Sequence, residues 1–135
     1  MKRLPTDLQL LDTIYGMYYD DFASYSDKTP NRSSKIYVPI DIDKIARQFN
    51  VDGDIIFGRL YYHLDQKYRY EQPEGGEVHL FSVVVGRDHH CVNFPYVASL
   101  VAGLREQDRK FRIATGMAMT SLLVSLVSFV LSLVR

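Results

Sequence analysis

The sequence has a single cysteine, and no apolar run follows the two positive charges of its N-terminal MKRLPTDLQ. One thiol excludes an intrachain disulfide framework and fits a reducing compartment. The missing apolar run predicts that this N-terminus is not a signal peptide. Internal repeats and low-complexity tracts are also absent. At 135 residues, the chain has room for one domain and an appendage.

Charge is balanced over the whole chain but not along it. The 16 basic residues match 16 acidic ones, yet residues 1–104 hold 11 basic and 14 acidic residues. Residues 105–112, REQDRKFR, hold four basic and two acidic groups. The sequence therefore predicts a weakly acidic domain at 1–104 and a basic juxtamembrane segment at 105–112.

Residues 113–134 carry no charge at all. Eleven of these 22 residues are Leu, Val, Ile or Phe, and about 20 such residues form a helix that crosses the hydrocarbon core of a bilayer. A buried helix of a soluble domain would need a far larger domain to cover it. An in-plane amphipathic helix would need Lys or Arg on its polar face. The pattern favours a transmembrane helix over both alternatives.

The charges beside this segment predict its orientation. The basic residues before it are Arg105, Arg109, Lys110 and Arg112, and only Arg135 follows it. The positive-inside rule then places the N-terminal domain in the cytoplasm, as in a tail-anchored, single-pass protein. A cleaved lipid-anchor signal would also end in an apolar tail, but it requires an N-terminal secretion signal. Because the N-terminus is not expected to be a signal peptide, we favour the tail anchor over this alternative.

Small residues recur within the apolar segment at heptad spacing. They are Ala114, Ala118, Ser121, Ser125, Ser128 and Ser132. A strict repeat of 3.5 residues implies a left-handed supercoil, and small residues let membrane helices approach closely. We expect this association seam to form a homo-oligomer, as a sealed dimer or as a larger ring around a polar path. The alternative is that each serine bonds to its own helix backbone and is merely tolerated.

The remaining residues predict a mixed α+β domain. Thr6 and Gln9 have capping-box spacing before a helix whose inner face would be Leu8, Leu11, Tyr15, Tyr18, Tyr19, Phe22 and Tyr25. KIYVPI (35–40) reads as an edge strand, DIDKIARQF (41–49) as a helix capped by Asp41, and NVDG (50–53) as a turn. We expect a third helix at 54–70, a hairpin around Gly75-Gly76, a loop at RDHHC (87–91), and a last helix capped by Asn93 that continues into the membrane.

This order of elements resembles the winged-helix superfamily. IDKIARQFNVDGDIIFGRLYYHLDQKYRY is similar to its helix-turn-helix, and YEQPEGGEVHLFSVVV is similar to its wing. The resemblance implies DNA binding by the third helix in the major groove. The matching residues would be Arg59, Tyr62, His63, Gln66, Lys67 and Arg69.

Charge argues against that DNA-binding role. The third helix opens with Asp52 and Asp54, and the hairpin tip carries Glu71, Glu74 and Glu77. Phosphate neutralisation supplies most non-specific affinity for DNA. Because winged helices also serve as protein-docking modules, the same six residues are more readily a face for a cytosolic protein partner.

No pattern for enzyme chemistry, a cofactor or a metal is present. Asp88, His89, His90 and Cys91 are adjacent, but neighbouring side chains point apart, and no second cysteine completes a zinc-type pair. Cys91 and a neighbouring histidine could form a nucleophile pair, but nothing near them in the sequence suggests an oxyanion hole. We therefore expect no catalytic, cofactor or metal residues.

Together, these patterns predict a small membrane protein whose cytosolic winged-helix-like domain docks or senses a partner and whose membrane helices self-associate. A membrane-permeabilising effector, antiviral or toxin-like, is the sharpest form of this hypothesis. A membrane-tethered, DNA-binding transcriptional regulator is the alternative.

Overall fold

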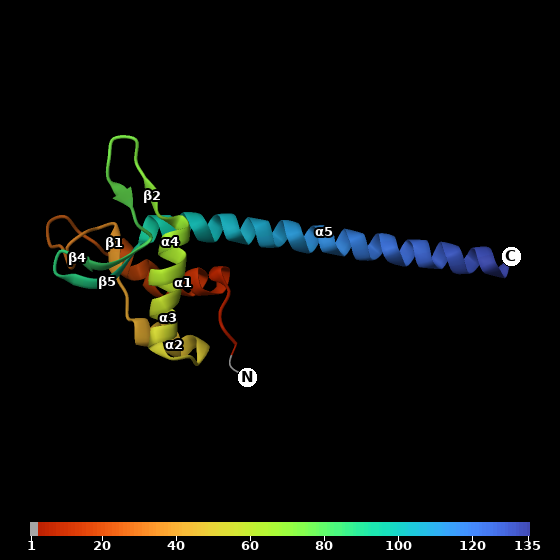
Figure 1. Cartoon of the computed structure of the whole chain (residues 1–135), viewed down its shortest axis with the longest axis horizontal. Helices are drawn as coiled ribbons and strands as arrows, with labels where there is room; N and C mark the ends of the chain where they lie inside the picture. Colours follow the sequence, from red (N-terminus) through yellow and green to blue (C-terminus); the bar gives the residue numbers. More distant parts are fainter. Residues whose placement is uncertain (1–2) are drawn as a thin grey trace. The chain divides into compact units, whose positions relative to one another are not determined.

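The computed structural model describes residues 3–135 and divides the chain into two compact units, one ending at Val101 and one running Ala102–Arg135. The fold is mixed α+β, with small antiparallel sheets and a long C-terminal apolar helix (Figure 1). The elements are α1 (Asp7–Ala23), β1 (Tyr37–Pro39), α2 (Ile42–Phe49), α3 (Gly53–Gly58), the π-helix η1 (Arg59–Leu64), α4 (Asp65–Tyr68), β2 (Tyr70–Glu71), β3 (Glu77–Val78), β4 (Phe81–Val85), β5 (Asp88–Asn93) and α5 (Phe94–Val134).

Helix α1 begins at the predicted capping box. The Gln9 N–H donates to the Thr6 hydroxyl at 3.1 Å, and the Thr6 N–H donates to the Gln9 side chain at 2.9 Å. The predicted inner face is partly wrong, because the buried residues of this helix are Leu10, Leu11, Ile14 and Tyr18. Aliphatic side chains, rather than the aromatic stripe, therefore supply most of its contact with the core.

The two helices that follow are separated by a short turn, as predicted. The Asp41 carboxylate accepts a hydrogen bond from the Lys44 N–H at 3.0 Å and caps α2. Asn50 ends α2 in the left-handed conformation, with φ 53°, which asparagine adopts more readily than most residues. Asp52 then caps α3, accepting from the Asp54 N–H at 2.8 Å.

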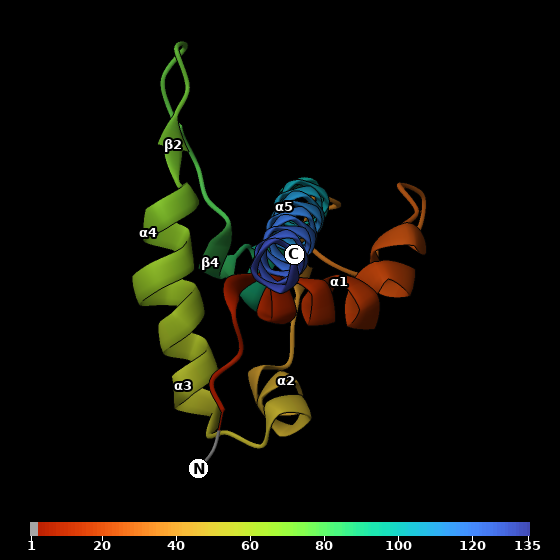
Figure 2. The same ribbon diagram turned by 90° about the vertical axis from the view of Figure 1, so that its right-hand side faces the viewer.

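The predicted third helix is one continuous helical stretch made of α3, η1 and α4. Figure 2 shows it as a single column that leads directly into β2. Ile56, Leu60 and Leu64 are fully buried and recur at helical spacing, and Phe57 is half-buried. The middle turn is a π-helix, a geometry that often occurs at functional sites.

The sheet topology corrects two predictions. The glycine hairpin exists, with positive φ at Gly75 and Gly76, but it joins only the two-residue strands β2 and β3. The predicted loop at 87–91 is wrong, because Asp88–Asn93 form β5. β5 lies between β1 and β4, and all the pairs are antiparallel. The predicted edge strand within residues 35–40 is confirmed, since β1 is an outer strand of the three-stranded sheet.

A buried arginine organises the loop between α1 and β1. The Arg32 guanidinium donates to the carbonyl oxygens of Asp21 and Phe22 at the end of α1, and to those of Ser34 and Lys35. Its cation also lies 5.8 Å from the centre of the Phe22 ring. The side chain therefore adds a donor to the last carbonyl groups of α1, which also accept from the Ser24 hydroxyl and the Tyr25 N–H.

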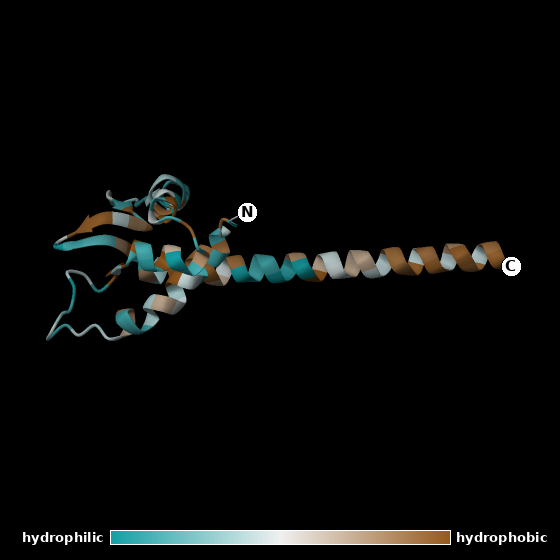
Figure 3. Cartoon of the chain, turned by 90° about the horizontal axis from the view of Figure 1, so that it is seen from below, coloured by the Kyte–Doolittle hydropathy of each residue, from teal (hydrophilic) through white to brown (hydrophobic). Residues whose placement is uncertain are grey.

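Helix α5 begins after Asn93, whose side chain accepts from the Tyr96 N–H at 3.2 Å, as predicted. Its first turns contribute Phe94, Val97 and Val101 to the core of the globular unit. In the second unit, the helix is charged up to Arg112 and uncharged from Ile113 to Val134. Figure 3 shows this change as a hydrophilic stretch followed by a hydrophobic one.

Candidate functional site

The predicted partner face divides into three groups of residues. Arg59 and Lys67 both bind Asp7, at 2.7 and 3.2 Å, and His63 Nδ1 lies 3.8 Å from the same carboxylate. Arg59 also donates to the Pro5 carbonyl, and its side chain is only 19% exposed. These three residues therefore lie toward the start of α1.

The other three predicted residues lie elsewhere on the third helix. Arg69 donates to the Gln66 side chain at 2.7 Å, and both residues are exposed near the start of β2. Tyr62 is 72% exposed and meets the Tyr61 ring edge-on, with centroids 5.0 Å apart. The six residues thus do not form one continuous basic face.

An aromatic cluster forms around Phe57 and was not predicted from the sequence. Phe57 stacks on Tyr61 at 5.3 Å and meets Phe81 and His90 edge-on at 5.8 and 5.7 Å. Tyr62 completes the cluster and meets both Tyr61 and Phe57 edge-on, at 5.0 and 6.5 Å. The signal in the sequence was the Phe57–Tyr61 spacing of four residues, but the contacts with Phe81 and His90 depend on β4 and β5 and could not be read from spacing.

A groove of about 680 Å³ adjoins this cluster. It lies where β1 meets α2, beside the start of α3 and one residue of β5. Its apolar residues are Ile40, Ile42 and Phe57, and its carboxylates are Asp41, Asp43 and Asp54. The Asp43 side chain lies over Gly53, where an added Cβ would come within 2.2 Å of Asp43 Oδ1. A glycine at this position therefore lets the carboxylate sit at the groove.

A second polar centre holds α4 to the strands. Buried Asp65 accepts hydrogen bonds from the Leu80 N–H at 2.9 Å and the Phe81 N–H at 3.1 Å. His79 lies between this carboxylate and Glu77, with nitrogen–oxygen distances of 3.1 and 3.2 Å. Because the Asp65 carboxylate already accepts these two backbone hydrogen bonds, its role is to hold α4 against the sheet.

The DHHC residues form part of a strand. Asp88 accepts from the Ser33 N–H at 2.7 Å, His89 is exposed, and Cys91 is fully buried. Burial, with a smaller contribution from Asp88, raises the pKa of the Cys91 thiol to about 11. At neutral pH the thiol is protonated and therefore a weak nucleophile. Within residues 3–135, no group of three His, Cys, Asp or Glu side chains is placed to hold a metal ion.

Helix α5 is long and apolar enough to cross a membrane. All residues of the stretch 113–134 are exposed in the isolated chain. The Thr120 hydroxyl donates to the Gly116 carbonyl at 2.9 Å, which is the backbone bonding expected of a tolerated polar residue. No such bond is made by Ser121, Ser125, Ser128 or Ser132 within the described residues.

The basic segment before this stretch carries two ion pairs along the helix. Lys110 lies 3.4 Å from Glu106, and Arg112 lies 3.0 Å from Asp108. Exposed pairs of this kind contribute little to stability. The positive-inside rule counts Lys and Arg rather than net charge, so the pairs leave the orientation signal in place.

Comparisons with protein-family models, with curated proteins and with solved structures found no match to this chain.

Proposed function

We propose that this chain is a single-pass membrane protein whose globular unit docks a protein partner and whose membrane helices associate with each other. The observation that carries this proposal is the exposed, uncharged stretch Ile113–Val134, which continues the same helix that begins in the core of a folded unit. Exposed apolar surface of this size is unfavourable in water and favourable in lipid. The chain therefore couples a folded module to a membrane anchor.

The globular unit lies on the cytoplasmic side in this proposal. The four cations Arg105, Arg109, Lys110 and Arg112 precede the span, and Arg135 alone follows it. Positively charged residues close to a span are retained in the cytoplasm.

The membrane helices associate through the seam of Ala114, Ala118 and the four serines. Small residues allow close backbone contact, and hydroxyls can bond across the seam. All four serines are exposed in the isolated chain, so their hydroxyls are accessible to a second helix. In a ring, the same hydroxyls would line a narrow polar path, and the protein would act as a membrane-permeabilising effector.

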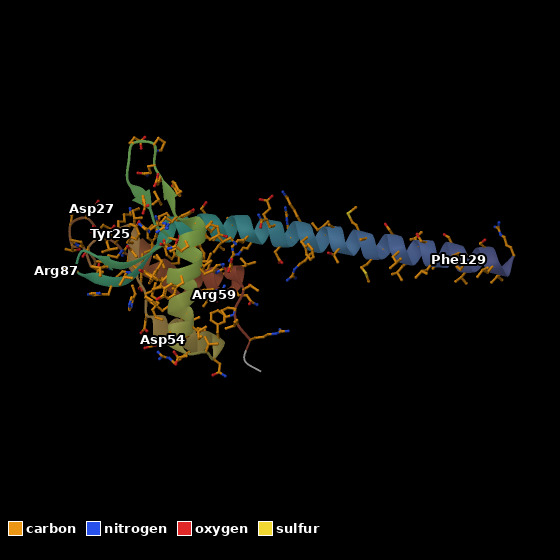
Figure 4. All side chains as sticks on the ribbon, viewed as in Figure 1. Tyr25, Asp27, Asp54, Arg59, Arg87 and Phe129 are labelled. Atoms are coloured by element: carbon orange, nitrogen blue, oxygen red, sulfur yellow. The ribbon has the colours of Figure 1, made fainter. Side chains whose placement is uncertain are left out.

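The globular unit is a winged-helix-like module in this proposal. The supporting features are the order α1, β1, α2, third helix and hairpin, and the sheet order β1-β5-β4. The hairpin that pairs with β1 is β4–β5, so the wing would end at Gly86 and Arg87 rather than at the glutamates of the β2–β3 hairpin (Figure 4).

Docking of a protein is better supported than binding of DNA. Arg87 at the tip of the β4–β5 hairpin is exposed and favours the DNA-binding regulator as a second candidate. The third helix favours protein docking, because Asp52 and Asp54 stand at its start and Arg59 and Lys67 are held by Asp7. A nucleic acid would meet few available cations there.

The experiment that tests this proposal measures association of the full chain in a membrane, by crosslinking or by a membrane two-hybrid signal. Ser125→Leu should lower association about tenfold, because the larger side chain separates the helices. Ser125→Ala keeps the small size and should retain most of the signal, since one hydrogen bond between membrane helices contributes only about 0.6 kcal/mol. Dye leakage from vesicles, measured on both variants, separates a conducting ring from a sealed dimer.

Gly116→Leu is the matched control, because it adds the same side chain off the seam, where an added Cβ meets nothing within 4 Å. It should associate as the parent does. Equal association of Ser125→Leu and the parent would reduce the helix to a simple anchor. Loss of conductance in Ser125→Ala with association retained would support the ring.

A further inference from the structure

The groove beside the start of α3 has an apolar floor that the globular unit does not cover. Ile40 is buried at its base, while Ile42, Phe57 and His90 are only half-buried. Its volume of about 680 Å³ is within the range of about 300–1,000 Å³ that is typical of ligand-binding clefts. All of these residues belong to the globular unit.

The floor continues onto exposed aromatic rings. Phe57 lines the groove and stacks on Tyr61, which in turn meets Tyr62 edge-on. Tyr61 and Tyr62 are 42% and 72% exposed. Exposed tyrosines beside a pocket are the side chains that most often anchor protein interfaces, since they give large contact area for little loss of conformational freedom.

The rim of the groove is acidic. The Asp41 carboxylate caps α2, but Asp43 and Asp54 form no ion pair with a Lys or Arg anywhere in residues 3–135. Among the residues that the structure describes, no Lys or Arg lines the groove. Figure 4 shows Asp54 at the beginning of the third helix. Acids at the starts of helices stabilise them, but that role does not explain the half-buried apolar floor between them.

We propose that this groove, with the tyrosines beside it, binds a cationic segment of a partner protein that also carries an apolar anchor. The anchor would enter between Ile42 and Phe57, and Arg or Lys side chains would pair with Asp43 and Asp54. A guanidinium would also stack on the tyrosine rings, as arginine does on aromatic faces. The inference rests on the protein-docking part of the proposed function and names the chemistry of the partner.

Charge selects this occupant over the others. Nucleic acid and anionic lipid headgroups would place negative groups against the carboxylates. A symmetric contact with a second copy would bring the same acidic rim to face itself. Only a cationic partner complements the rim while filling the apolar floor.

The test uses the full chain in nanodiscs of zwitterionic phosphatidylcholine, with fluorescence anisotropy of a labelled hexapeptide, LRRFRR. The peptide should bind, and the double variant Asp43→Asn with Asp54→Asn should weaken binding at least about fivefold. Tyr62→Ala should weaken it independently, since that change leaves the helix starts intact. Asp27→Asn, on a loop away from the groove (Figure 4), is the matched control and should bind as the parent does.

The inference would be overturned if LRRFRR did not bind, or if the double variant bound it as tightly as the parent does. It would also be overturned if the acidic peptide LEEFEE bound as tightly as LRRFRR. A fourth contradicting result is tighter binding of a short DNA duplex that is lost in Arg87→Ala. None of these results depends on membrane insertion or on association between the membrane helices. A failure of this inference is therefore distinguishable from a failure of the membrane part of the proposed function.

Discussion

Arg32 shows how one side chain determines the course of a loop. It is 9% exposed and donates to four backbone carbonyl groups, two of them from the last turns of α1. The Tyr25 ring lies 4.8 Å from its cation. Truncating this side chain is strongly destabilising, because the carbonyl groups of Ser34 and Lys35 lose the donor that Arg32 supplies, and those of Asp21 and Phe22 keep only their weaker local donors, the Ser24 hydroxyl and the Tyr25 N–H.

Arg32→Ala should therefore lower the free energy of unfolding by about 2–4 kcal/mol. Arg32→Lys should recover only part of this loss, since an ammonium group cannot reach all four acceptors with the planar geometry of a guanidinium. The measurement is urea denaturation of the full chain in detergent, followed by circular dichroism. Arg47→Ala, at an exposed position of α2, is the matched control and should change the midpoint little. An Arg32→Ala midpoint equal to that of the control would contradict this role.

At the scale of elements, Asp7 joins the start of α1 to the third helix. Burial alone would raise the pKa of the Asp7 carboxyl, but hydrogen bonds from Lys67 and Arg59 outweigh it and hold that pKa below its usual value. Because the folded-state pKa is lowered, the stabilisation is fully present above the unfolded-state pKa of about 3.9 and is lost as the pH falls through the folded-state value.

The parent should consequently lose more stability than Asp7→Asn when the pH falls from about 4 to about 2. Near neutral pH, Asp7→Asn should already be less stable than the parent, since Arg59 then lacks its carboxylate partner. Urea midpoints over this pH range provide the measurement. Parallel pH profiles for the parent and the variant would show that the pairing contributes nothing to folding.

The sequence predicted the elements that depend on local spacing. Caps such as Thr6 with Gln9, and Asp41, involve residues three apart, and the turn at Gly75-Gly76 depends on two adjacent residues. β5 was missed because its polar run resembles a loop, and only pairing on both sides makes it a central strand. The sequence likewise could not show that the Asp65 carboxylate is buried, because its hydrogen-bond donors, Leu80 and Phe81, are distant in the chain.

The predicted site shows this limit most clearly. Arg59 and Lys67 were expected to face a partner, but the contact with Asp7, more than 50 positions away in the chain, turns their charges toward α1. Tyr62 was placed on an exposed surface and is exposed, and its ring neighbours Phe57 and Tyr61 come from the same helix, whereas Phe57 also meets Phe81 of β4. Helical spacing gives the face of a residue but not what lies opposite it.

At the scale of the whole molecule, the two units differ in how far their apolar side chains are buried. The globular unit buries an ordinary apolar core, whereas the stretch 113–134 exposes its apolar side chains along its whole length. Phe129, for example, is 63% exposed, and Figure 4 shows it projecting from α5. Lipid is the solvent in which such a helix is stable, because its backbone groups are paired internally and its side chains are apolar.

Whether α5 spans a membrane is measured by the topology of the full chain, with reporters fused before residue 1 and after residue 135. We expect the chain to remain in the membrane after alkaline extraction. The N-terminal reporter should be active only in the cytoplasm, and the C-terminal reporter only on the opposite side. Extraction of the chain into the soluble fraction, or both reporters on one side, would contradict the claim that α5 spans the membrane. A spanning helix with the reporters reversed would contradict the cytoplasmic placement of the globular unit.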